Sequence, residues 1–267
     1  MPALVFRNSL FMLALFAAGT VLAEPRFSFQ ATPGKLPKDV VPAHYSMRFA
    51  PDLAKDRFDG RVEIEIDVAK PVKALTLNAA NLTIRSAVVV TSGVRVLLSA
   101  SVDAANETVT LAPAAGVVIL PGRARLSIDY SGPISKHSQG FFQVPYKVRE
   151  GGRLVDKKML ATHFEPVHAR KMFPSWDEPA FRATFDIAVQ VDDGLTAVSN
   201  MPVLKVSPLP GGKKEVVFAR SVSMPTYLVA LVVGELDSLQ DEVDGIKLGI
   251  YTVKDGKIVK EEFFYSM

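Results

Sequence analysis

The chain has 267 residues, with 31 lysine and arginine residues against 28 aspartate and glutamate residues. Because these charges nearly balance and no long run of one sign occurs, the composition argues against nucleic acid as a partner. The chain contains no cysteine, so disulfides cannot hold the fold, but a chain of this length can bury a sufficient core without them.

The first 23 residues have the pattern of a secretory signal peptide. Arg7 supplies a short positive region, residues 10–18 are apolar and uncharged, and residues 21–23 form a small-residue cleavage pattern. The apolar run is shorter than the roughly 20 residues that span a bilayer, which disfavours the alternative of an uncleaved anchor. We therefore expect an exported protein, periplasmic or secreted, with no membrane span after cleavage.

Alternating segments follow a polar, proline-punctuated leader at residues 24–34. The clearest is 61–68, where four apolar residues would share one face of a strand and acidic residues the other. Many short strands separated by turns predict an all-β fold, an antiparallel sandwich or saddle of sheets. The further strands predicted in this way are residues 44–49, 74–77, 82–90, 95–100, 108–111, 123–130, 185–191 and 215–219, with a strand buried on both faces at 227–233.

One short helix is predicted, at residues 177–182. Ser175 and Glu178 have the spacing of a capping box, and Pro179 is tolerated in a first helical turn. We therefore interpret Ser175, Asp177 and Glu178 as a helix cap. No longer helical period occurs in the sequence.

Residues 161–187 concentrate the side chains that could form a site, including two of the four histidines and the only tryptophan. They do not form a zinc motif, because His163 and His168 are five residues apart, whereas one helical face needs four. No H-E-x-x-H occurs, and a zinc site needs three or four converging ligands. We therefore expect no metal, no bound cofactor and no catalytic residue in this chain. The apolar residues of the stretch are expected in the core: Phe164, Met172, Phe173, Trp176 and Phe181.

Glu165 is the candidate binding residue of this stretch. It lies between Phe164 and Pro166, where we expect its carboxylate to be partly desolvated and to need a cationic partner. Arg170 could supply that partner from within the chain, and so could the amine of a ligand. The residues alone leave these two alternatives open.

Three blocks of the sequence resemble the aminopeptidase N-type zinc metallopeptidases. Residues 36–45 (LPKDVVPAHY) resemble the first strand of that family, L-P-x-x-V-x-P-x-H-Y. Residues 162–185 resemble its signature T-Q-F-E-P-x-x-A-R-x-x-F-P-x-x-D-E-P-x-F-x-A-x-F. Residues 199–202 (SNMP), 224–228 (MPTYL) and 232–234 (VVG) complete the set in family order.

The resemblance implies the N-terminal, saddle-shaped β domain of such an enzyme for residues 35–244. It also implies that Glu165 helps bind the free α-amino group of a peptide substrate, with a weaker role for His163, which stands where the family usually has glutamine. The family's zinc-binding and catalytic motifs are absent from this sequence, so zinc is expected only in a full-length member. On this interpretation residues 245–267 are a truncated or divergent start of the catalytic domain.

The sequence thus predicts the substrate-amine-contacting domain of an exported aminopeptidase, inactive alone. The alternative is a stand-alone β-sandwich that acts as a binding or assembly module, or that pairs with a separately encoded catalytic half. The tail should distinguish the two, because a module should bury Phe263, Phe264 and Tyr265 and a fragment should expose them.

Overall fold

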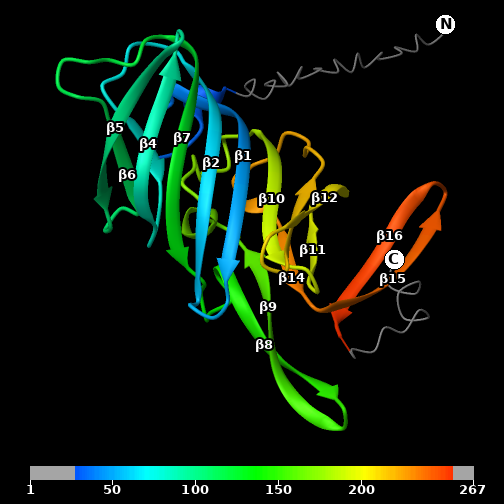
Figure 1. Cartoon of the computed structure of the whole chain (residues 1–267). Helices are drawn as coiled ribbons and strands as arrows, with labels where there is room; N and C mark the ends of the chain where they lie inside the picture. The colour runs from blue at the N-terminus through cyan, green and yellow to red at the C-terminus, as the bar shows by residue number, and fades with distance from the viewer. Residues whose placement is uncertain (1–27, 255–267) are drawn as a thin grey trace, which may run out of the picture. The chain divides into compact units, whose positions relative to one another are not determined.

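The structure, a computed structural model, describes residues 28–254 (Figure 1). The predicted signal peptide, the first four residues of the predicted leader and the three tail aromatics lie outside the described residues. The chain divides into two units, residues 1–32 and 33–267. The described part of the first unit holds the short 3-10 helix η1 (Phe29–Ala31), and everything below concerns the second.

A ten-stranded sheet is the main element of the second unit, with the order β12-β13-β10-β1-β2-β7-β4-β5-β6-β3. Figure 1 shows β1, β2, β7, β4 and β5 side by side. Neighbouring strands are antiparallel except β1 and β10, which run parallel. The strands are β1 (Val40–Asp52), β2 (Arg57–Val68), β3 (Leu75–Asn78), β4 (Thr83–Thr91), β5 (Val94–Asp103), β6 (Thr108–Ala112), β7 (Gly122–Pro133), β10 (Thr184–Asp192), β12 (Val203–Leu209) and β13 (Lys213–Phe218).

Two smaller sheets complete the described chain. One has the order β11-β14-β9-β8, and the other is the hairpin β15-β16. Their strands are β8 (Gly140–Glu150), β9 (Arg153–His163), β11 (Thr196–Ser199), β14 (Leu231–Gly234), β15 (Leu236–Val243) and β16 (Ile246–Val253). The predicted boundary between residues 244 and 245 falls in the turn of this hairpin. Within residues 28–254, none of the helices has the length and apolar character that crossing a bilayer requires.

The predicted all-β class is confirmed, and β2 shows why the sequence dictates it. Val62, Ile64, Ile66 and Val68 are at most 4% exposed, while the side chains between them face outward. Burying each apolar side chain contributes about 1.5–3 kcal/mol relative to an exposed position. Alternation therefore fixes which face of the strand packs inward. The other eight segments predicted from alternation also match strands to within one residue at the ends that extend past them.

Glycines allow two aromatic rings to lie across the backbone of neighbouring strands. Gly60 on β2 pairs with Tyr130 on β7, and Phe58 on β2 pairs with Gly132 on β7. A Cβ at Gly60 would meet the Tyr130 ring, and one at Gly132 would lie 2.8 Å from the Phe58 ring. The rings thus occupy the space that a side chain at either glycine would need.

Two predictions were wrong. Residues 177–182 form no helix, because the side chains expected to cap it bind elsewhere, as described below. The run at 227–233 is not one strand: it begins within the 3-10 helix η3 (Thr226–Leu228) and enters β14 only at Leu231. The chain turns there because Leu228 and Val229 donate backbone hydrogen bonds to Pro225 and Thr226. The long hairpin of β8 and β9 was not predicted.

Candidate substrate-binding turn

The candidate residues lie where β9 ends and a tight turn begins. His163 is the last residue of β9, and residues 164–168 lead into the 3-10 helix η2 (Ala169–Lys171). The backbone N–H of His168 donates to the carbonyl oxygen of Phe164 at 3.0 Å, which closes the turn. Glu165 lies inside this closed loop of backbone.

Phe164 anchors the first end of the turn in the core. Its side chain is 2% exposed and packs edge-to-face on Phe173, with ring centroids 6.1 Å apart. Phe173 in turn packs edge-to-face on Tyr45 of β1, also at 6.1 Å. The predicted core role is confirmed for the five residues named for it in this stretch, each at most 2% exposed: Phe164, Met172, Phe173, Trp176 and Phe181.

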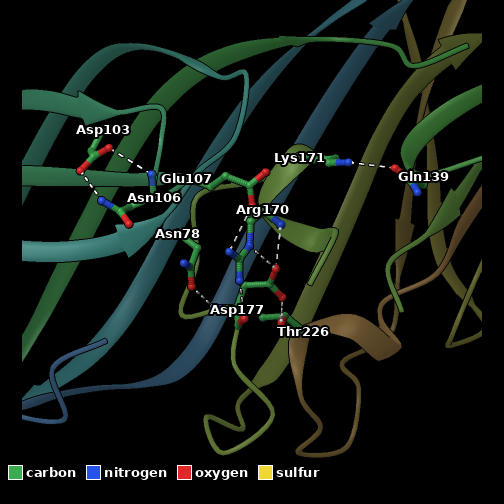
Figure 2. Close-up of polar contacts among 9 residues, drawn as sticks. All are labelled: Asn78, Asp103, Asn106, Glu107, Gln139, Arg170, Lys171, Asp177 and Thr226. Atoms are coloured by element: carbon green, nitrogen blue, oxygen red, sulfur yellow. Dashed lines mark hydrogen bonds and ion pairs between the residues drawn. The ribbon is translucent and has the colours of Figure 1, made fainter. Parts of the chain in front are cut away.

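Arg170 anchors the other end through a buried ion pair, which Figure 2 shows. Its Nε lies 3.0 Å from Oδ2 of Asp177, and its backbone N–H donates to the same oxygen at 3.2 Å. Nη2 donates to the Asp177 carbonyl oxygen at 3.0 Å, and Nη1 lies 3.3 Å from Oε2 of Glu107. Since Asp177 is 2% and Arg170 9% exposed, removing either partner would leave a costly buried charge.

Asp177 is held by groups from distant parts of the chain. Thr226 on η3 donates its hydroxyl to Oδ1 at 2.6 Å, and the backbone N–H of Asp177 donates to Oδ1 of Asn78 at 3.1 Å. Asn78 is the last residue of β3. The turn between β5 and β6 also joins this network, because its Glu107 pairs with Arg170. The predicted helix cap is therefore wrong at Asp177, because this carboxylate serves a tertiary network instead.

Ser175 and Glu178 do not form a capping box either. Ser175 pairs with Asn78 through two backbone hydrogen bonds, and its hydroxyl donates to the carbonyl oxygen of Phe173 at 3.3 Å. Oε1 of Glu178 accepts the backbone N–H groups of Lys35 at 2.6 Å and Leu36 at 3.0 Å. The glutamate thus fastens the chain that enters β1, more than 140 residues away in sequence.

Glu165 itself is exposed. Among residues 28–254 it has neither a hydrogen bond nor an ion pair, so the expectation of a partly desolvated carboxylate is wrong for this chain. The internal alternative is also wrong, because Arg170 is committed to Asp177 and Glu107. The backbone around Glu165 is strained: Val167 has φ +85°, a conformation that costs a β-branched residue roughly 1–3 kcal/mol.

The two histidines of the stretch differ in environment. His163 is exposed, and its Nδ1 lies 3.0 Å from the carbonyl oxygen of Ser138. Because a carbonyl only accepts, Nδ1 carries the hydrogen, and a neutral ring then presents Nε2 as an acceptor. His168 is half-buried, and its Nδ1 is buried without a partner in the described chain. Burial, and then the charge of Lys171, lower the pKa of His168.

The described residues offer no cluster of metal-binding side chains. Across the described range, 28–254, no group of three or more histidine, cysteine, aspartate or glutamate side chains could hold a metal ion. The residues present therefore do not fit a zinc site, and we assign no metal chemistry to them.

Comparison with known proteins agrees with this fold and this turn. Residues 41–228 match the family described as the Peptidase M1 N-terminal domain. The match covers well over half of the chain, so the chain belongs to this family. The predicted resemblance is thereby confirmed, and the match includes both β1 and the turn with Glu165.

Individual relatives are aminopeptidases. Aminopeptidase N of Acetobacter pasteurianus is 42% identical over 234 residues, which are 88% of this chain and 64% of that protein. Aminopeptidase M1 of Arabidopsis thaliana is 37% identical over 81% of this chain and 25% of its own length. The puromycin-sensitive aminopeptidase of Caenorhabditis elegans is 33% identical over 87% of this chain and 24% of its own. The chain thus spans less than two thirds of the first relative and about a quarter of the others.

Proposed function

We propose that this chain supplies the substrate-amine-contacting part of an aminopeptidase that removes N-terminal residues from peptides. The observation that carries the proposal is the state of Glu165. Its carboxylate is exposed and has no partner within residues 28–254, on a turn fixed at both ends by buried groups. The similarity to aminopeptidases supports the assignment.

The negative charge of Glu165 would let the enzyme select peptides with a free N-terminus. An exopeptidase must distinguish a protonated α-amine from an internal or acylated amide, and a carboxylate pairs with the first and not with the second. The discrimination grows when the complex excludes water, because the attraction between opposite charges rises as the dielectric constant falls. His163, adjacent to this turn, would present Nε2 as an acceptor when its ring is neutral, because its Nδ1 donates to the carbonyl oxygen of Ser138.

We propose that a part of the enzyme other than residues 28–254 cleaves the peptide bond. We propose that the 267-residue chain alone does not hydrolyse peptides, and that a zinc-bearing catalytic part, on the same or a separate polypeptide, completes the enzyme. We also propose export, to the periplasm or beyond the cell, on the signal-peptide pattern of residues 1–23.

Two measurements test the proposal. The intact mass of the product isolated from its own source shows whether the polypeptide extends past residue 267. Peptidase assays of that product then compare a peptide that has a free N-terminus with its N-acetylated form. We expect cleavage of the free peptide only, and Glu165→Gln should raise its KM at least several-fold without lowering the melting temperature.

A matched control is Glu65→Gln, an exposed carboxylate on the outer face of β2. It should leave KM unchanged. Equal KM values for wild type and Glu165→Gln would refute the amine-binding role. Zinc-dependent release of N-terminal residues by the purified 267-residue chain would refute the claim that it is inactive alone. A source product no longer than residue 267, without a catalytic partner, would favour a stand-alone binding module.

A further inference from the structure

We infer that Asp177 is a positioning residue for Glu165: it holds Arg170, so that the turn keeps its shape and the guanidinium stays away from the Glu165 carboxylate. The inference rests on the proposed function and adds to it the group that keeps the amine site open. Asp177 itself is buried and would not touch the substrate.

The turn that carries Glu165 is short, and its backbone is strained. Only Glu165, Pro166, Val167 and His168 lie between the buried anchor Phe164 and helix η2. Val167 is held at φ +85°, a conformation unfavourable for a β-branched side chain. A turn of this kind persists only when its ends are held. The Asp177 carboxylate holds one end directly, because Oδ2 accepts the backbone N–H of Arg170 at 3.2 Å.

The positive charge of Arg170 is paired with carboxylates other than Glu165. This guanidinium is five residues from Glu165 in sequence, and the sequence alone allowed the two to pair. In the structure all three nitrogens of the guanidinium are engaged by oxygens of Asp177 and Glu107, at 3.0 to 3.3 Å. Figure 2 shows the side chain of Arg170 lying between these two partners. Arg170 is therefore occupied, and Glu165 remains available to an external amine.

Asp177 is fixed by hydrogen bonds to residues outside the turn. Its Oδ1 accepts the hydroxyl of Thr226 at 2.6 Å, and its backbone N–H donates to Asn78. These groups come from η3 and β3, so the carboxylate is fixed from outside the turn. Without its negative charge, Arg170 would be left paired only with Glu107, whose side chain is 42% exposed. The nearest other carboxylate along the chain is then Glu165.

The test uses the source product and the same free-amine peptide. Asp177→Asn should raise KM at least about fivefold while kcat changes less, and should also lower the melting temperature. The double variant Asp177→Asn with Arg170→Met removes the released guanidinium as well. We expect KM to return to within about twofold of wild type, because the side-chain oxygen of asparagine can still accept the backbone N–H at position 170. The melting temperature should still be low. A purely structural role would move KM and melting temperature together, so a KM that stays high in the double variant overturns the inference.

Milder variants serve if Asp177→Asn does not fold. Thr226→Val removes the hydroxyl that fixes Asp177 and keeps the side-chain volume, and Glu107→Gln weakens the second partner of Arg170. Each should raise KM about two- to threefold. In the 267-residue chain, Thr226→Val should also speed hydrogen exchange of the His168 amide about tenfold, whereas Thr226→Ser should not. Unchanged KM and exchange would overturn the inference.

Glu165→Gln separates the two claims in the same assay. If it leaves KM unchanged, the proposed function fails. If it raises KM while the variants at Asp177, Thr226 and Glu107 do not, the proposed function stands and this inference fails.

Discussion

Tyr45→Phe removes one buried hydroxyl and leaves one backbone donor without an acceptor. The hydroxyl of Tyr45 accepts the backbone N–H of Trp176 at 3.2 Å, and both residues are 1% exposed. The phenyl ring would keep its stacking on Phe185, with centroids 5.0 Å apart, because the packing does not depend on the hydroxyl. The loss is therefore that of a buried hydrogen bond, which costs about 1–3 kcal/mol.

Urea denaturation measures this cost, and Trp176 is a specific reporter because it is the only tryptophan. For a slope of about 2–3 kcal/mol per molar urea, the midpoint should fall by roughly 0.3–1.5 M. Burial raises the pKa of Tyr45 above its usual value of 10.0, so the hydroxyl stays protonated in the fold. The difference between variant and wild type should therefore be the same at pH 7 and pH 9.

Tyr251→Phe is the matched control, since Tyr251 is 41% exposed on β16 and makes only a long hydrogen bond of 3.5 Å. Its midpoint should not move. A Tyr45→Phe midpoint equal to that of wild type would refute the reasoning, because the Trp176 N–H would then have found another partner at no cost.

Three further predictions follow from the same structure. Burial lowers the pKa of His168 below 6.5, so the unfolded chain binds a proton at this residue more readily than the folded chain. The melting temperature should therefore fall as the pH drops below about 6.5, and it should fall less in His168→Gln; thermal melts at a series of pH values measure both. Gly60→Ala should lower the melting temperature by several degrees, because its Cβ would meet the Tyr130 ring; a melting temperature within one degree of wild type would contradict it. Glu178→Ala should speed tryptic cleavage after Lys35, because the backbone N–H groups of Lys35 and Leu36 lose their acceptor. Glu178→Gln keeps an acceptor and should be cleaved more slowly than Glu178→Ala.

Alternation in the sequence determined most of the fold. The inward face of β2 was evident from residues 61–68 alone, because strict period-2 alternation leaves one face to bury. The family was also determined by sequence, since the blocks at residues 162–185, 199–202 and 224–228 lie within the match over residues 41–228. The β8–β9 hairpin was not predicted, although burial alternates along residues 144–149 of β8 and 154–159 of β9. Few of these residues are fully buried and the more buried positions include Lys157, so the alternation of apolar residues is weak.

Only the tertiary structure decided how the candidate turn is held. Ser175, Asp177 and Glu178 have the local spacing of a helix cap, yet each binds a partner from another part of the chain. Arg170 is five residues from Glu165 and seven from Asp177, and sequence spacing could not choose between them. The choice was made by burial: Asp177 lies in the core, where an unpaired charge is costly, whereas Glu165 is exposed and its charge is solvated without a partner.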